Sequence, residues 1–473
     1  MADNPPLTFS IKFHGGVDEV TGSRHLVELG DKRVLLDCGL FQGHRLQSLE
    51  KSRTFPAEPA SISAVLLSHA HIDHSGGLPL LVKQGFSGAI HCTAPTADLL
   101  SIMLRDSALI QEEDAKFFNK LHADEGVTIE PLYTLADAEK TLGFLVPHPY
   151  DEHFPVAEGM EGSLHNAGHV LGSAMVRLSL KTLKRTRHVL FTGDLGRRDA
   201  LIMNPPKIPH HVDYLLTEST YGGRRHPEIT GVAEALTEII LRSEKENGPL
   251  LIPTFALERA QELIYMLGKL MARGKIKPIP IYVDSPMATD ITGLFQKHLD
   301  SLSISDDFRR YVSRNGDPFE GPAVHYVRMS EESKRIMNLP GRKIIMAGSG
   351  MCEGGRILHH LRNLVGEGNT TILFVGYQAQ GTLGRQLAEG AKKVRIFGLT
   401  HDVAAQIQRM KHFSAHADQD DLDWFIQGLS PRPEKIFLVH GGQEQREALK
   451  AHLENQGIGR LELPHYGERF ELD

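Results

Sequence analysis

Cysteine is scarce in this chain. Among its 473 residues only Cys38, Cys92 and Cys352 are cysteines, and they are far apart and form no CxxC pair. An odd number of scattered cysteines argues against a disulfide framework and against a cysteine-based zinc site. The sequence therefore predicts a protein of a reducing compartment, the cytoplasm.

Long apolar runs and a targeting segment are missing as well. The sequence contains no run of roughly 18 or more apolar residues, the length at which a membrane-spanning helix is expected. Residues 1–10 have neither a basic segment nor the apolar stretch that follows it in a signal peptide. These absences predict a chain without a membrane span, a membrane partner or a cleaved leader.

An excess of positive charge is also absent. Lys and Arg number 52 against 59 Asp and Glu, which gives a formal net charge of −7. By itself this balance disfavours nucleic acid as a partner. Bound divalent cations would supply positive charge where an anionic substrate lies, so the net charge weakens that partner class without excluding it.

The length argues for two or more domains, and the order of strand-like and helix-like segments indicates where they divide. Between about 218 and 400, strand-like runs alternate with helical patterns at 231–247, 257–273 and 355–365. The runs lie at 249–253, 280–284, 323–327, 343–347, 371–375 and 393–397. Such alternation predicts a parallel sheet with helices on both faces. We expect a first domain whose two parts, 1–215 and 399–473, flank an inserted domain at 216–398.

The most informative segment is HAHIDH at residues 69–74, directly after the apolar run 63–67. The run predicts a buried strand, so the cluster lies on the turn at its carboxyl end. His69 and His71 can hold one ion while Asp73 and His74 hold a second. Imidazole and carboxylate ligands favour zinc or a similar divalent ion. Chance clustering is the alternative, because the chain has 26 histidines.

Other ligand-type residues also close short strand-like runs. These residues are Asp37, Asp194, Glu218 and His440. Residues gathered from many strand ends line one rim of a layered sheet structure. His169, in the glycine-containing stretch 166–173, is the expected third histidine of the first ion, whereas His165 is expected to be an ordinary polar histidine.

Together these residues define a two-ion site with a hydroxide in the open position between the ions. The first ion is assigned to His69, His71, His169 and Asp194. The second is assigned to Asp73, His74, Asp194 and His440. Asp37 is expected to orient a ligand from behind. Two Zn²⁺ per chain are favoured, and Mn²⁺ is compatible with the same residues.

The motifs resemble those of the metallo-β-lactamase superfamily, whose HxHxDH signature residues 69–74 match. Downstream, TESTYG at 217–222, FSAHAD at 413–418 and VHG at 439–441 resemble motifs A, B and C of the β-CASP nucleases. Further matching segments lie at 253–263, 284–288, 348–351 and 376–383. The resemblance runs from about Phe13 to the C-terminus. It implies an α/β fold, a metallo-β-lactamase αββα sandwich with an inserted parallel-sheet β-CASP domain.

The resemblance is closest to the branch that holds the endonuclease subunit of the mRNA 3′-end cleavage machinery and its bacterial relatives. It implies an endoribonuclease that cuts single-stranded RNA, in a cleft between the domains, to 5′-phosphate and 3′-hydroxyl ends. Asp73, Glu218 and His416 are the expected catalytic residues. His416 is the candidate general acid, held in position by Glu218.

Contacts to RNA are predicted on the inserted domain. Ser349, Gly350 and Met351 follow the strand-like run 343–347, and backbone N–H groups of such a turn can hold a phosphate. An ordinary strand–helix turn is the alternative. Arg259, Arg356 and Arg385 are candidate phosphate contacts, unless they are surface or ion-paired arginines.

Three other functions compete with this interpretation. A 5′-exoribonuclease of the same family would use the same ions. A small-molecule metallohydrolase acting on thioesters or lactams would not need the long inserted domain. A non-catalytic RNA-binding protein would not need the intact ligand set. A homodimer is a further expected partner.

Overall fold

The computed structural model describes residues 8–43, 45–122 and 128–473. The first seven positions of the segment predicted to lack a signal peptide lie outside these ranges. In the described ranges no helix combines the length and the apolar character that a bilayer crossing requires. All three cysteines are buried and unbonded to one another.

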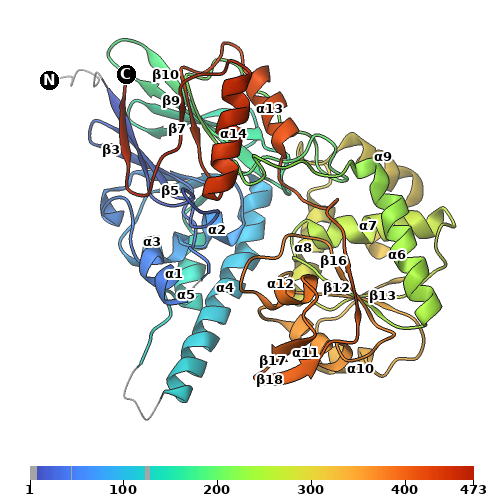
Figure 1. Cartoon of the computed structure of the whole chain (residues 1–473). Coiled ribbons are helices and arrows are strands. Elements are labelled where there is room, and N and C mark those ends of the chain that lie inside the picture. The colour runs from blue at the N-terminus through green and yellow to red at the C-terminus, as the bar shows by residue number, and fades with distance from the viewer. Residues whose placement is uncertain (1–7, 44, 123–127) are drawn as a thin grey trace. The chain divides into compact units, whose positions relative to one another are not determined.

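The chain folds into two compact units (Figure 1). Unit 1 comprises Met1–Arg225, Ser301–Ser303 and His416–Asp473, and unit 2 comprises His226–Asp300 and Ile304–Ala415. The two main boundaries between the units follow Arg225 and Ala415, which is later in the chain than the boundaries expected after 215 and 398. The second boundary lies later because β19 (Gln406–Arg409) pairs with β16 (Thr371–Phe374) inside unit 2.

Two seven-stranded sheets form the centre of unit 1. The first runs in the order β22-β1-β2-β3-β4-β5-β6, antiparallel from β22 to β3 and parallel from β3 to β6. Its strands are β1 (Phe9–Phe13), β2 (His25–Leu29), β3 (Lys32–Leu36), β4 (Ala64–Leu66), β5 (Ala89–Cys92), β6 (Leu145–Pro147) and β22 (Arg469–Leu472).

The second sheet runs in the order β21-β20-β11-β10-β9-β8-β7. It is antiparallel from β7 to β10 and parallel from β10 to β21. Its strands are β7 (His153–Ala157), β8 (Met160–Asn166), β9 (Ala174–Lys181), β10 (Thr186–Phe191), β11 (Tyr214–Thr217), β20 (Lys435–Leu438) and β21 (Leu461–Glu462).

The period-2 alternation of the strands packs these sheets face to face. Val34 and Leu36 of β3 share one buried cluster with Val189 and Phe191 of β10, so alternate residues of both sheets point inward. On the outer face of the second sheet, Leu190 of β10 packs with apolar residues of α13 (Gln419–Gly428) and α14 (Gln443–Asn455).

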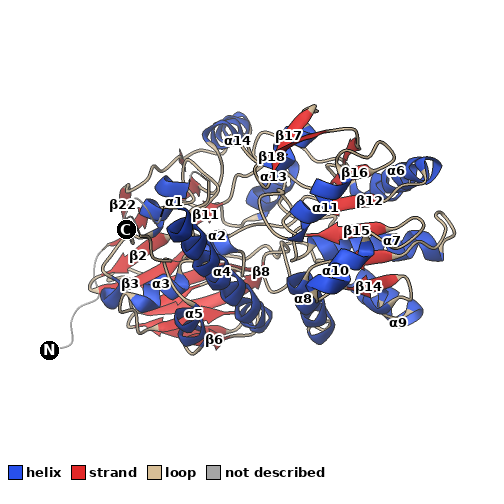
Figure 2. Ribbon diagram, turned by 90° about the horizontal axis from the view of Figure 1, so that it is seen from below, coloured by secondary structure: helices blue, strands red, loops and turns tan. Residues whose placement is uncertain are grey.

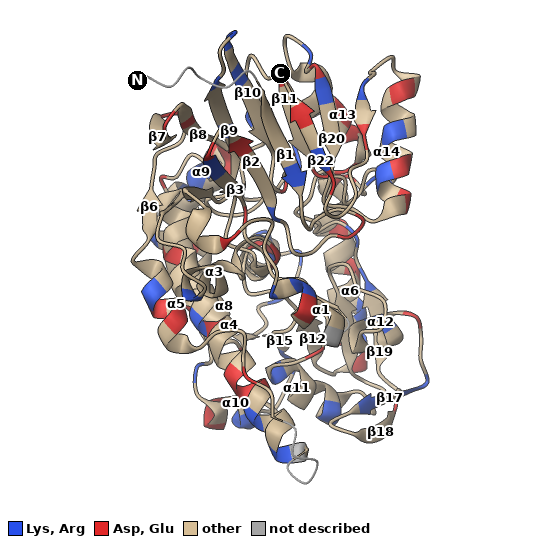
Figure 3. Ribbon diagram, turned by 90° about the vertical axis from the view of Figure 1, so that its left-hand side faces the viewer, with Lys and Arg blue, Asp and Glu red and all other residues tan. Residues whose placement is uncertain are grey.

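Helices also cover the first sheet, namely α3 (Leu78–Lys83), α4 (Ala94–Leu121) and α5 (Leu135–Leu142) (Figure 2). The layers are therefore helix, sheet, sheet and helix, which confirms the predicted αββα sandwich. Acidic and basic residues are interspersed along α4, α5 and α14 (Figure 3). Each of these helices therefore carries only a small net negative charge.

Unit 2 contains a six-stranded sheet in the order β14-β13-β15-β12-β16-β19, and all its pairings are parallel. The remaining strands are β12 (Leu250–Pro253), β13 (Ile281–Val283), β14 (Val324–Tyr326) and β15 (Ile344–Ala347). Its helices are α6 (Val232–Glu246), α7 (Arg259–Ala272), α8 (Pro286–Lys297), α9 (Asp306–Asn315), α10 (Ser330–Ile336), α11 (Arg356–Leu364) and α12 (Leu383–Ala388). The predicted parallel sheet and the three predicted helices are confirmed.

One predicted strand was assigned to the wrong sheet. The run 393–397 forms β17 (Lys393–Ile396), which pairs antiparallel with β18 (Leu399–Asp402) in a separate hairpin. Phe397 and Gly398 at its turn have φ of 49° and 79°, as a two-residue hairpin turn requires. The sixth parallel strand is instead β19, which the sequence analysis did not identify.

Candidate metal centre

The candidate metal ligands of unit 1 lie on connections that follow strands. His69 and His71 follow β4, and Asp73 and His74 lie on the short helix α2 (Ile72–Ser75). Asp194, Glu218 and His440 follow β10, β11 and β20, respectively. Those three strands are neighbours and run parallel, so their carboxyl ends meet at one rim of the sheet.

The first ligand group consists of His69, His71, His169 and Asp194. One ligand atom from each lies within 4.8 Å of the others. His71 Nδ1 is 3.0 Å from His69 Nε2 and 3.3 Å from His169 Nε2. Asp194 Oδ2 is 3.5 Å from His69 Nε2 and 3.4 Å from His169 Nε2. Tetrahedral zinc, with ligand atoms about 2.0–2.1 Å away, separates those atoms by about 3.3 Å. The spacing therefore fits such an ion.

The second group consists of Asp73, His74 and His440. The Nε2 atoms of His74 and His440 are 3.1 Å apart, and Asp73 Oδ2 is 3.9 and 3.6 Å from them. The other oxygen of Asp194, Oδ1, is 3.2 Å from His74 Nε2 and 3.2 Å from His440 Nδ1. The two oxygens of one carboxylate thus face the two groups.

Asp194 is buried, which bears on whether its carboxylate binds a cation. Its side chain is 2% exposed, and Oδ1 has no hydrogen-bond partner with suitable geometry among the described residues. A buried carboxylate oxygen left in this state costs free energy unless a cation or a donor satisfies it. The residues present therefore fit a bridging role for Asp194. A third grouping, of Asp194 with Glu218 and His440, is also close enough to hold a cation.

Asp37 and Ser68 support the ligands from behind. Asp37 Oδ2 is 2.6 Å from His74 Nδ1, on the opposite side of the ring from the ligand nitrogen. The hydroxyl and backbone N–H of Ser68 donate to Asp37 at 2.8 and 2.7 Å, and the same hydroxyl lies 2.9 Å from His69 Nδ1. Asp37 thus lies where it orients a histidine, and it belongs to neither ligand group. Ser68 was not among the predicted site residues, although it directly precedes His69.

Contacts with Gly16 and Thr220 fix His440 in place. Its backbone has φ of 47° and donates its N–H to the carbonyl of Gly16 at 2.5 Å. The hydroxyl of Thr220 lies 3.2 Å from His440 Nδ1 and donates to the His440 carbonyl at 3.1 Å. Thr220 was also overlooked, although it belongs to the TESTYG segment that includes Glu218. These contacts hold a ligand that is distant in sequence from the first cluster.

Electrostatics divides the histidines of the two ligand groups into two kinds. Burial lowers the pKa of His71 to about 4 and lowers that of His69 well below its ordinary value. Burial also opposes protonation of His74, but Asp194, Asp73 and Asp37 raise the pKa of His74 well above 6.5. A cation that binds at His74 must therefore displace a proton, so metal affinity should fall as pH falls.

His416 and Glu218 form a pair beside the ligand groups. His416 Nδ1 lies 3.1 Å from Glu218 Oε2, and Glu218 is buried, with Oε1 accepting the N–H of Leu195 at 2.5 Å. The His416 ring lies 4.6 Å from the His169 ring, centroid to centroid. Burial lowers the pKa of His416, yet Glu218 and Asp194 raise it to about 9. The pair can therefore hold a proton next to the ligands.

The predicted polar histidine His165 does not join either group. Its Nδ1 lies 2.7 Å from Asp151 Oδ1 and its Nε2 lies 3.1 Å from the Ser163 hydroxyl. His165 and His169 are only four residues apart. The end of β8 at Asn166 separates them, so His165 remains within the strand and His169 lies in the loop that reaches the rim.

The residues predicted to contact RNA all lie in unit 2. Ser349, Gly350 and Met351 form the loop between β15 and α11, where the Ser349 hydroxyl accepts the N–H of Glu353 at 3.0 Å. Each of the three arginines has an ion-pair partner. The pairs are Arg259–Glu262, Arg356–Asp284 and Arg385–Glu389, each at 2.6 Å. These ion pairs are compatible with the alternative of surface or ion-paired arginines, and contact of the three arginines with RNA stays a prediction.

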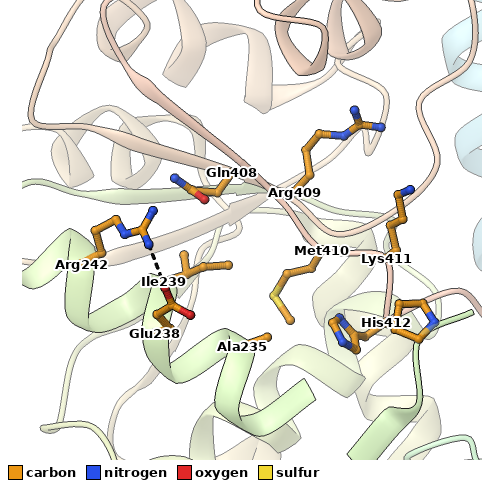
Figure 4. A pocket seen from close by; sticks show the side chains of 10 residues that line it. Ala235, Glu238, Ile239, Arg242, Gln408, Arg409, Met410, Lys411 and His412 are labelled. Atoms are coloured by element: carbon orange, nitrogen blue, oxygen red, sulfur yellow. Dashed lines mark hydrogen bonds and ion pairs between the residues drawn. The ribbon is translucent and has the colours of Figure 1, made fainter. Parts of the chain in front are cut away.

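A hollow of about 420 Å³ lies elsewhere in unit 2 (Figure 4). It is lined by residues of α6, including the Glu238–Arg242 ion pair at 2.8 Å, and by 408–412 at and after β19. The side chains of Met410 and His412 point toward α6 in this view. None of the candidate ligands or predicted RNA contacts lines it, so this hollow is separate from the candidate metal centre.

Comparison with protein families agrees with the geometry. Residues 18–222 match the model of the metallo-β-lactamase superfamily, 260–387 match the β-CASP domain, and 400–461 match the Zn-dependent metallo-hydrolase RNA specificity domain. The third match contains both His416 and His440.

Individual relatives extend over nearly the whole chain. It is 36% identical over 458 residues to ribonuclease TTHA0252 of Thermus thermophilus, covering 96% of this chain and 98% of that protein. It is 30% identical to the transcription termination factor FttA of Methanosarcina mazei, covering 91% of this chain and 66% of that protein. A crystal structure of a protein of unknown function from Enterococcus faecalis V583 shares the fold, with a TM-score of 0.55 at 14% identity, and covers 98% of this chain and 100% of that one.

These matches, together with the ligand-bearing rim, have one consequence for classification: the chain belongs to the β-CASP family, the hydrolytic nucleases of the metallo-β-lactamase superfamily.

Proposed function

We propose that this protein is a metal-dependent endoribonuclease that hydrolyses phosphodiester bonds of single-stranded RNA. The observation that carries the proposal is Asp194, whose two buried oxygens face two separate ligand groups. That geometry suits a pair of divalent cations better than a single one. The relative named as a ribonuclease and the matched RNA specificity domain support RNA as the substrate class.

Two Zn²⁺ are the favoured ions, because the ligands are imidazoles and carboxylates, and Mn²⁺ is compatible with the same set. One would be held by His69, His71, His169 and Asp194. The other would be held by Asp73, His74, His440 and Asp194. When bound, such a pair lowers the pKa of water and stabilises charge on the attacking and leaving oxygens.

His416 is the proposed proton donor for the leaving 3′-oxygen. Glu218 contacts Nδ1 and so fixes the ring, which leaves Nε2 on the other side as the atom that delivers the proton. Its pKa of about 9 keeps the ring protonated at neutral pH, and neighbouring cations would lower that pKa toward neutrality by repulsion. A donor with a pKa near the working pH is effective in general acid catalysis. The expected products carry 5′-phosphate and 3′-hydroxyl ends.

A circular single-stranded RNA tests the proposal directly. We expect the protein to open the circle, to lose this activity on chelation and to regain it on addition of Zn²⁺ or Mn²⁺. An intact circle alongside degraded linear 5′-phosphorylated RNA would identify a 5′-exoribonuclease instead. Hydrolysis of thioesters without cleavage of either RNA would identify a small-molecule hydrolase.

A further inference from the structure

Two aromatic side chains of unit 2 are exposed without a ring partner. The side chains of Phe255 and Tyr377 are 42% and 50% exposed, whereas Phe295, Phe308 and Phe374 of the same unit are at most 1% exposed. Phe397 is also exposed, but it contacts the His359 ring at 4.8 Å. Within the described part of the chain, Phe255 and Tyr377 have no such ring contact and no cation over the ring. Their apolar surface is therefore open to a ligand.

These residues share a special position in the parallel sheet. Phe255 follows β12 and Tyr377 follows β16, and these two strands are neighbours. After β12 the chain continues to β13 on one side of the sheet, and after β16 it continues to β19 on the other side. The chain thus reverses direction across the sheet between β12 and β16. In open parallel sheets, ligands bind outside the carboxyl ends of the strands at such a reversal.

The backbone around Phe255 holds its ring in place. A Cβ at Gly350 would lie 2.8 Å from two carbons of the Phe255 ring, so only glycine permits this close approach. The Gln378 amide donates to the carbonyls of Gly350 and Tyr377 at 3.0 and 3.1 Å. These contacts tie together the loops that follow β15 and β16. A surface fixed in advance loses little conformational entropy when it binds.

We propose that Phe255 and Tyr377 form a stacking platform for unpaired bases of the RNA substrate. The choice of RNA as the ligand rests on the proposed function. The position of the two rings follows from the strand order of the parallel sheet and is independent of that function. Bases of single-stranded RNA expose their faces and stack on aromatic rings, whereas bases of a duplex are already stacked on one another. Stacking accepts any base, so the platform would bind RNA with little dependence on sequence.

Binding of short unstructured RNA to the full-length protein in the presence of a chelator tests the platform without cleavage. We expect Phe255→Leu and Tyr377→Leu each to weaken binding at least ~5-fold, the lower end of the stacking contribution of one base. Phe255→Trp should retain binding, because it retains the stacking surface. Phe117→Leu is the matched control, since Phe117 is 66% exposed on α4 in unit 1. A ribose-phosphate chain of equal length without bases should bind all variants alike.

Unchanged RNA affinity in both leucine variants, or an equal loss of affinity for the chain without bases, would overturn the platform. Failure of the wild type to prefer RNA over that chain would overturn it as well. These results are separable from the proposed function. A wild type that opens circular RNA while the leucine variants bind normally refutes the platform alone. Base-dependent binding without cleavage refutes the nuclease activity alone.

Discussion

The rim of unit 1 and the carboxyl edge of the sheet in unit 2 are both formed by loops after parallel strands, but they present different kinds of side chain. In both, loops that follow neighbouring parallel strands bring distant residues together. The unit 1 rim gathers buried histidines and carboxylates, with Asp194 at 2% exposure. The unit 2 edge presents exposed rings and arginines that already have ion-pair partners. One architecture therefore supports both a site for ions and a surface suited to apolar stacking.

Removing the carboxylate shared by the ligand groups is the strongest test of the comparison. We expect Asp194→Asn to abolish RNA cleavage and to lower the metal content well below two ions per chain, because both groups lose an oxygen ligand. Cleavage of circular RNA and elemental analysis measure the two effects. Asp151→Asn is the control, since Asp151 pairs with His165 outside the ligand groups. Full activity in Asp194→Asn would show that the rim is not the site of chemistry.

The next test separates proton transfer from metal binding. His416→Ala should lower turnover by about 10²–10⁴-fold, the usual contribution of general acid catalysis, while the metal content stays unchanged. His416 belongs to none of the three ligand groups, which is why we expect the ions to remain. Single-turnover cleavage and elemental analysis are the measurements, with His165→Ala as the control. A metal content reduced by half would identify His416 as a ligand.

A smaller effect on metal binding is expected when Asp37, which contacts the ligand His74, is replaced. Asp37→Ala removes the carboxylate 2.6 Å from His74 Nδ1, and such changes typically lower metal affinity about 10–100-fold. Competition with a chromogenic chelator measures this affinity. Asp151→Ala, which disrupts a similar histidine contact away from the rim, should leave the affinity unchanged. An equal loss in both variants would point to a general effect on folding.

The smallest effect concerns a buried histidine of unit 1 outside the ligand groups. Burial lowers the pKa of His25, which lies between Phe13 and Phe191, to about 3. Below pH about 6.5 the unfolded chain takes up a proton at His25 that the folded chain takes up only near pH 3. The contribution of His25 to the free energy of unfolding therefore falls by about 1.4 kcal/mol per pH unit as the pH falls from about 6.5 towards 3.

Urea unfolding of chelated protein at pH 6.5 and pH 5 measures this contribution. Between the two pH values, His25→Leu should lose about 1.6 kcal/mol less of its free energy of unfolding than the wild type. Phe117→Leu, at a side chain that is 66% exposed and carries no titratable group, should behave like the wild type. Equal pH dependence in all three proteins would show that His25 is not held neutral.

The sequence was most informative where residue type and local order coincide. HAHIDH follows β4 directly, so its place at a strand end was predictable from the apolar run before it. The helices α6, α7 and α11 were predictable from their periodicity to within a residue or two at each end. By contrast, β19 was not recognised. Its residues 406–409 include one apolar residue, Ile407, and all four are at least partly exposed. This suits an edge strand, whereas an apolar run marks a central one.

Residue types at short fixed spacings were enough to identify the family, the layered α/β fold and the set of side chains able to bind metal. Packing between distant segments was needed to establish that Asp194 faces both ligand groups, that Thr220 contacts His440 and that Arg356 pairs with Asp284. These features depend on distances between segments that are up to hundreds of residues apart. Such distances are set by strand order and packing, which no local pattern contains.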